Sequence, residues 1–346
     1  MSKIESHPSG HEPRPSTLDL RTSVPPTLLL IKPGSLGDVV HALPVAAALH
    51  DAMPGTKLAW VVDPRWQPIL EGNPAISRCI PFPREQFRGV TGTAKAVGWF
   101  AGLRDLQPSV AVDLQCLLRS ALVAACSRAG RRIGLSDARE GAARFYHATA
   151  AVNDRMHAVD RYLAVLPLLG VAIPEHPRFD IGAGDPIPGF DTTGFVLLHP
   201  FARGAGKSLS ADHVRRMCEM LSPRPVVLAG VGNAPSNLPA NTHNLANRTT
   251  LRQLIWLIRR AATVISVDSG PMHLAAAANV PLLSIHTWSD PRKVGPHSET
   301  AFIWQGGEIR RQSLRGDAPL LPEQPINETD LEAIATWGIT VPPASS

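Results

Sequence analysis

A short turn between an apolar run and a segment of small residues has the chemistry of a phosphate site. The run AATVISV is typical of a buried strand, and Asp268, Ser269 and Gly270 follow it directly. The next residue is Pro271, which favours the first turn of a helix. The glycine allows a ligand close to the backbone, and the unpaired amides of a helix N-terminus attract anions. The alternative is an ordinary turn in which Asp268 or Ser269 caps the helix and His273 packs beneath it.

A second turn of this kind lies near the start of the chain. It follows the apolar run LLLI and has the sequence KPGSLGD, in which Gly37 and Asp38 stand where a helix of alanine and leucine begins. Its two glycines favour close approach of a ligand. The turn has neither the GK[ST] ending of a P-loop nor the GxGxxG pattern of a dinucleotide site. Asp38 is therefore either part of a ligand site or a residue that caps the helix.

Two further stretches carry positive charge. A glycine-rich loop, FARGAGKS, follows a predicted strand in the second half and contains Arg203 and Lys207, which suit phosphate oxygens. A solvated basic loop is the alternative. Residues 84–104 mix Arg84, Arg88 and other basic residues with aromatic ones, which suits an anionic, partly apolar partner such as a membrane surface. An amphipathic surface helix with its loop is the alternative.

Composition is that of a globular protein with two domains. The chain has 346 residues and a net charge of +5, with 44 % hydrophobic and 18 % charged residues. Its basic balance favours phosphate or membrane partners, whereas 5 % aromatic residues and the lack of dense lysine or arginine blocks argue against nucleic acid. Four scattered cysteines and thirteen histidines without ligand spacing predict neither a disulfide framework nor a metal site. Without a secretory signal or membrane-spanning run, a cytoplasmic location is expected.

The alternation of apolar segments predicts an α/β fold with two doubly wound halves. Residues 1–26 are expected to be a disordered extension, residues 27–173 the first domain and residues 174–193 a proline- and glycine-rich linker. The second domain then covers residues 194–326, and residues 327–346 form a helix and tail that are expected to pack back on the first domain. Strands are predicted at 28–31, 57–62, 78–81, 110–114, 132–135, 194–200, 225–230, 261–267 and 281–285.

The segments KPGSLGDVVHALP and SVDSGPMHLAAA resemble those of the lipopolysaccharide heptosyltransferases, and HPFARGAGKSLS fits the loop of that family more loosely. The resemblance covers most of the chain after the N-terminal extension. It implies a GT-B architecture, in which two Rossmann-like domains face one cleft. It also implies that the C-terminal half binds a nucleotide sugar, usually ADP-heptose, and that the N-terminal half takes a lipid-linked saccharide acceptor. No cofactor is implied.

The resemblance assigns roles to individual residues. It implies that Asp38 is the catalytic base and that Lys207 contacts the donor diphosphate, with Arg203 beside it. The donor turn comprises Asp268, Ser269 and Gly270, with His273 on the following helix. Candidates for acceptor contacts are Gly37, Arg84, Arg88, Arg119 and Arg139.

Two departures from the family bear on the donor. Ser208 and Leu209 stand where an aromatic residue usually follows the lysine, and Asn233 stands near the position of a glutamate that holds the donor ribose in some members. Asn233 is therefore a candidate contact to the ribose or base.

Together these features predict an inverting, metal-independent glycosyltransferase that moves a heptose from ADP-heptose to Kdo or heptose of the lipopolysaccharide inner core. It would act at the cytoplasmic face of the inner membrane. Two alternatives stay open: a two-domain nucleotide-sugar epimerase, and a non-catalytic protein that binds nucleotide sugars.

Overall fold

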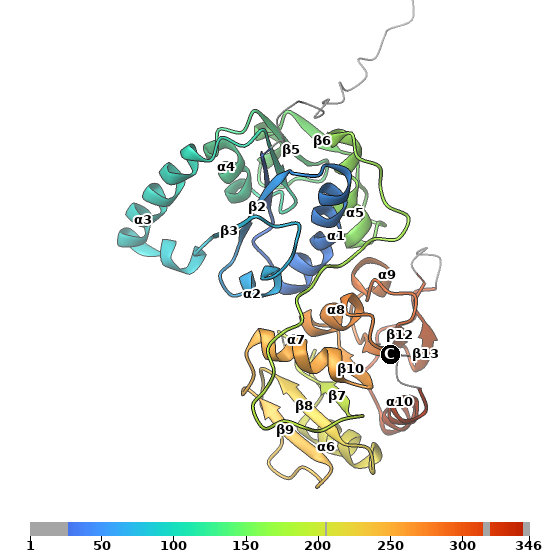
Figure 1. The fold of residues 1–346 in the computed structure, drawn as a ribbon. Coiled ribbons are helices and arrows are strands. Elements are labelled where there is room, and N and C mark those ends of the chain that lie inside the picture. The colour runs from blue at the N-terminus through green and yellow to red at the C-terminus, as the bar shows by residue number, and fades with distance from the viewer. Residues whose placement is uncertain (1–26, 205, 314–318, 342–346) are drawn as a thin grey trace, which may run out of the picture.

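The molecule consists of two lobes, each built on its own β-sheet (Figure 1). The computed structural model describes residues 27–204, 206–313 and 319–341. Both sheets are parallel apart from one edge strand, and helices cover both faces of each, so the predicted doubly wound α/β fold is confirmed. The predicted extension at 1–26 and the end of the predicted tail at 342–346 lie outside the described residues.

The first sheet has six parallel strands in the order β3-β2-β1-β4-β5-β6. The strands are β1 Thr27–Ile31, β2 Lys57–Val62, β3 Arg78–Pro81, β4 Val110–Asp113, β5 Arg131–Leu135 and β6 Ala148–Ala150. The helices are α1 Leu36–Ala52, α2 Gln67–Leu70, α3 Gly89–Gly102, α4 Leu118–Cys126 and α5 Ala158–Leu163, with short 3₁₀ turns η1 Arg84–Phe87, η2 Leu103–Asp105, η3 Ala142–Phe145 and η4 Leu166–Leu169.

The apolar run of β1 shows why this strand is central. Leu28 and Leu30 belong to the core on one face of the sheet, whereas Leu29 and Ile31 belong to the core on the other face. Successive side chains of a strand point to opposite faces, so a strand covered on both sides needs an unbroken apolar run rather than an alternating one. The run LLLI is therefore the local signal for a central parallel strand.

The second sheet has seven strands in the order β13-β12-β11-β10-β7-β8-β9, and its edge strand β13 runs antiparallel to β12. The strands are β7 Val196–His199, β8 Val226–Gly230, β9 Thr242–Ala246, β10 Thr263–Val267, β11 Leu282–Ile285, β12 Phe302–Gln305 and β13 Glu308–Arg311. The helices are α6 Ala211–Met220, α7 Leu251–Arg260, α8 Gly270–Ala277, α9 Pro291–Val294 and α10 Glu328–Thr340.

The C-terminal helix differs from the prediction that it packs back on the first domain. Helix α10 lies against α6, β10 and β13 of the second lobe. Leu331, Ile334 and Trp337 of this helix share an apolar core with Val214 and Met217 of α6. The apolar face of α10 is therefore buried within its own lobe. No pattern in the sequence indicates which element this face packs against.

The two lobes touch through apolar side chains. One core cluster contains residues of both sheets, including Leu30 of β1 and Val264 of β10, and helix α1 packs on α8 between the lobes. Residues 174–193, the predicted linker, contain no helix or strand and run past α7, where Arg252 pairs with Asp185 at 2.6 Å. No helix of the described residues combines the length and the hydropathy needed to cross a bilayer.

Candidate active site

A cavity of about 630 Å³ lies between the lobes. Its wall comes from the N-terminal ends of α1 and α8, the loop after β7, the end of β8 and the start of α7. These are the carboxyl ends of parallel strands in both sheets, where doubly wound proteins place their ligands. The predicted residues that line it are Gly37, Asp38, Arg203, Lys207, Asp268, Ser269, Gly270 and His273. The structure thus brings together positions separated by more than 200 residues in sequence.

Asp38 is held by partners on both carboxylate oxygens. Oδ2 accepts bonds from the backbone amide and the hydroxyl of Ser35, at 2.8 and 2.9 Å. Oδ1 accepts a 2.8 Å bond from the hydroxyl of Tyr162 and lies 3.4 Å from Nζ of Lys32. The side chain remains 35 % exposed. Asp38 therefore both caps α1, as the alternative interpretation had it, and presents a carboxylate to the cavity.

The surroundings keep this carboxylate ionised. Burial favours the neutral acid, but the Lys32 ammonium and the hydrogen bonds from Tyr162 and Ser35 outweigh it, so the pKa of Asp38 is lowered. Burial lowers the pKa of Lys32 in turn, although the attraction of Asp38 opposes that shift. Lys32 is 3 % exposed, and its ammonium also lies over the Tyr162 ring, 4.8 Å from the centroid. Asp38 is therefore a fixed, ionised carboxylate rather than a mobile surface acid.

The turn into α8 leaves helix amides open to the cavity. Ser269 is the N-cap residue, but its side chain makes no bond to the helix. Its hydroxyl lies 3.2 Å from Nδ1 of His199 and 3.1 Å from the carbonyl oxygen of Val267 instead. The capping alternative for Ser269 is therefore not observed. A helix N-terminus without a side-chain cap retains amide donors and positive potential for an anion.

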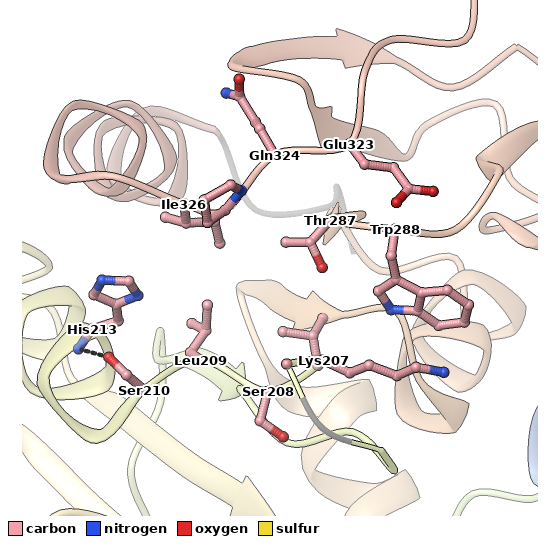
Figure 2. Close-up of a pocket in the computed structure, with 13 residues that line it drawn as sticks. Lys207, Ser208, Leu209, Ser210, His213, Thr287, Trp288, Glu323, Gln324 and Ile326 are labelled. Carbon is pink, nitrogen blue, oxygen red and sulfur yellow. Dashed lines mark hydrogen bonds between the residues drawn. The ribbon is translucent and has the colours of Figure 1, made fainter.

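Arg203 and Lys207 lie on the loop after β7 and rest on aromatic rings. The guanidinium of Arg203 is 5.5 Å from the Trp66 ring, and Nζ of Lys207 is 3.3 Å from the Trp288 ring. Figure 2 shows the lysine side chain running beneath the indole, beside a second cavity of about 380 Å³. Within the described parts of the chain, neither cation has a carboxylate within 4.0 Å. Both side chains are therefore available to an incoming anion.

A pair of histidines joins the lobes next to Asp38. Nε2 of His41 on α1 lies 2.9 Å from Nδ1 of His273 on α8, and both side chains are buried. A Cβ atom at Gly37 would lie only 2.5 Å from the His273 ring, so a glycine is needed for this contact. His273 was predicted to contact the donor nucleotide sugar. Its Nδ1 atom is hydrogen-bonded to His41 of the other lobe.

Five predicted contacts lie away from the cavity. Asn233 does not line it, although its neighbours Gly230 and Val231 do. The other four are exposed on the first lobe and do not line the cavity either: Arg84, Arg88, Arg119 and Arg139. Arg88 pairs with Glu85 at 3.2 Å.

Sequence reasoning missed several residues of the site. Lys32 and Tyr162, which hold Asp38, were not predicted, nor were His41, Trp66 and Trp288. Lys32 directly follows the predicted first strand, a position that could have drawn attention to it. Tyr162 lies 124 residues from Asp38 inside a helix, without a local signal. In the part of the chain that the structure describes, there is no group of three histidine, cysteine or acidic residues arranged for a metal ion.

Comparison with known proteins identifies the family. The model of glycosyltransferase family 9 (heptosyltransferase) matches residues 100–316, more than half of the chain. The chain belongs to glycosyltransferase family 9. The predicted resemblance and the enzyme class, glycosyltransferase, are thereby confirmed.

Relatives of this family 9 protein cover most of its length. Lipopolysaccharide heptosyltransferase 1 of Pseudomonas aeruginosa is 29 % identical over 294 residues, 79 % of this chain and 82 % of that protein. The lipopolysaccharide core heptosyltransferase OpsX of Haemophilus influenzae is 23 % identical, over 81 % and 84 %. The Escherichia coli heptosyltransferase WaaC, solved with ADP-2-deoxy-2-fluoro heptose, aligns with a TM-score of 0.69 at 24 % identity, covering 81 % and 93 %. The last comparison shows that the fold is the predicted GT-B architecture.

Proposed function

We propose that this protein is an inverting glycosyltransferase that moves a heptose from ADP-heptose to Kdo or heptose in the inner core of lipopolysaccharide. One observation carries the proposal. An ionised carboxylate from one lobe faces the same cavity as an uncapped helix N-terminus and two cations from the other lobe. A sugar transfer to a hydroxyl needs a base on one side of the anomeric carbon and stabilised negative charge on the other.

Asp38 would act as the general base. As the acceptor oxygen attacks the anomeric carbon, its proton passes to a carboxylate oxygen of Asp38. The new C–O bond forms on the face opposite the diphosphate, and the old C–O bond breaks with its electron pair leaving on ADP. The configuration at that carbon is inverted. The bonds from Tyr162 and Ser35 fix the carboxylate before the substrate arrives, which avoids reorganisation during the reaction.

The second lobe would hold the donor diphosphate. Lys207 and Arg203 are cations without a carboxylate partner in the described chain, and the uncapped N-terminus of α8 supplies amide donors at Ser269 and Gly270. Such fixed positive groups stabilise the departing ADP in a scheme that uses no metal ion. Asp268 and His273 line the same cavity and would contact the donor sugar. Asn233 lies outside the cavity, in the loop that follows β8. It would contact the donor ribose only after that loop had moved toward the cavity.

The acceptor would reach the first lobe from a membrane. The relatives' names refer to lipopolysaccharide, whose inner core is anionic and carried on a lipid. Arg84, Arg88, Arg119 and Arg139 are exposed on the first lobe, where they would bind phosphates or carboxylates of the acceptor. The protein would then work in the cytoplasm against the inner membrane, without spanning it.

Nucleotide binding and transfer test the proposal in two steps. Calorimetry with ADP, UDP and GDP should show a preference for ADP. The protein should then transfer heptose from ADP-heptose to a Kdo-bearing lipid A, with the opposite anomeric configuration in the NMR spectrum of the product. Preference for UDP or GDP would exclude the heptose donor, and conversion of the nucleotide sugar without an acceptor would indicate an epimerase. Binding of ADP without either reaction would indicate a non-catalytic protein.

A further inference from the structure

The N-terminal ends of α1 and α8 meet between the lobes through two glycines. Gly37 of α1 lies under the His273 ring, and a Cβ atom at Gly270 of α8 would collide with Leu36. The contact is thus reciprocal, since each helix offers a glycine to a side chain of the other. Each of these helix ends also carries one part of the proposed chemistry, with Asp38 on α1 and the donor turn before α8.

The hydrogen bond between His41 and His273 fixes how these ends face each other. His41 follows Asp38 by three residues on α1, and His273 follows Gly270 by three residues on α8, so each histidine lies one helical turn inside its helix. The rings meet edge to face with centroids 4.2 Å apart. A hydrogen bond depends on direction as well as distance, whereas apolar contacts allow the two surfaces to slide.

The pair is built for neutral rings. Burial lowers the pKa of His41 well below its usual value, helped by the neighbouring His273 and His157, and burial lowers that of His273 to about 4. Two neutral imidazoles satisfy each other, because one nitrogen donates and the other accepts. A second bond between the lobes, from His157 to the carbonyl oxygen of Gly295 at 3.1 Å, lies beside the pair.

We propose that His41, through His273, is a positioning residue that sets the distance between the base Asp38 and the donor turn. This inference rests on the proposed function. In that reaction the base and the donor belong to different lobes, and only the contact between lobes fixes their separation. Misplacing reacting groups by about 1 Å costs on the order of 100-fold in rate. Neither histidine needs to touch the reacting atoms for this effect.

Kinetics of two substitutions at His41 test the role. Phenylalanine keeps an aromatic ring, of somewhat larger size, and removes the bond, whereas glutamine keeps a donor and an acceptor. His41→Phe should lower kcat about 10- to 100-fold and leave the dissociation constant of ADP within about twofold, while His41→Gln should recover much of the loss. The matched control is His50→Phe, at an exposed histidine of the same helix, which should leave kcat unchanged. Unchanged kcat in folded His41→Phe would overturn the proposal.

A measurement without turnover separates this inference from the function. Urea unfolding of His41→Phe, His273→Phe and the double variant forms a cycle, and a direct bond predicts non-additive changes. Amide exchange in α8 should also increase in His41→Phe and stay unchanged in His50→Phe. Additive changes with unaltered exchange would refute the contact. If the cycle is non-additive but the wild-type protein transfers no heptose, the contact stands and the proposed function fails.

Discussion

Charges on the two sides of the cavity are held in opposite ways. On the first lobe, Asp38 has partners on both oxygens, and Lys32 beside it is buried. On the second lobe, Arg203 and Lys207 have no carboxylate partner in the described chain and lie over indole rings. One side is a rigid network of hydrogen bonds, and the other is a pair of cations on a glycine-rich loop.

The contrast fits the different tasks in the proposed reaction. A base must be in place before the acceptor arrives, and reorganising it would raise the barrier. A cation that binds the diphosphate must first meet the donor and then release ADP. An aromatic ring holds a cation with only about 0.5–1 kcal/mol at an exposed site, so an anion can draw it away. A carboxylate partner would compete with the donor directly.

The largest effect should come from the rigid side. Asp38→Asn keeps the shape of the residue but removes the base, so kcat should fall about 100- to 10,000-fold while ADP still binds. Steady-state transfer and calorimetry measure the two quantities. The exposed surface acid Asp51 on the same helix supplies the control Asp51→Asn. Transfer by Asp38→Asn at a rate near that of the wild type would remove Asp38 from the mechanism.

Next in size is the loss of one cation on the second lobe. Lys207→Ala removes a charged contact worth about 1.5–3 kcal/mol, so ADP should bind about 10- to 100-fold more weakly. Lys57→Ala, at an exposed lysine where β2 begins, should bind ADP normally. Equal affinities of Lys207→Ala and the wild type would mean that Lys207 does not contact the diphosphate.

A smaller change should appear in the pH dependence. Tyr162→Phe removes a hydrogen bond that stabilises the ionised form of Asp38, so the pKa of that carboxyl should rise. The base works only when ionised, and the acidic limb of kcat/KM should therefore move to higher pH. At neutral pH the loss in rate should be about 3- to 10-fold, since one hydrogen bond contributes about 1 kcal/mol. An unmoved acidic limb would contradict the assignment of Asp38 as the titrating base.

The smallest effect is expected from Trp288, whose ring contacts the ammonium of Lys207. Trp288→Leu removes the ring beneath which Lys207 lies, and ADP binding should weaken about two- to fivefold, in line with a cation–π contact. Trp99→Leu, in the aromatic cluster of the first lobe, is the control. A loss as large as that of Lys207→Ala would show that Trp288 itself contacts the nucleotide.

Local patterns explain what the sequence could predict. Apolar runs such as LLLI mark buried parallel strands, and strands β2 and β3 begin and end at the predicted residues, 57–62 and 78–81. Strands β6, β9, β12 and β13 were missed, because β6 has only three residues, β9 and β13 are polar and short, and β12 lacks flanking signals. Strands at or next to a sheet edge are defined by pairing with a neighbour rather than by their own composition.

Parts of the site were beyond prediction for a related reason. The glycine turns at Asp38 and Gly270 carry their own signal in adjacent residues. Tyr162 and His41 act through partners that are distant in sequence, and nothing in their local segments specifies those partners. Residue-by-residue analogy also placed Asn233 in the site, whereas the structure places it in the loop after β8, outside the cavity.

The docking of α10 on its own lobe has a consequence for how the polypeptide can be divided. Within the described residues, the strands β1 to β6 form one sheet and β7 to β13 the other, so the chain passes between lobes once, through residues 174–193. A break there would give two fragments, each with a complete sheet. Their reassembly would depend on the glycine contacts of α1 and α8, which makes restored transfer in a split protein a direct reporter of that interface.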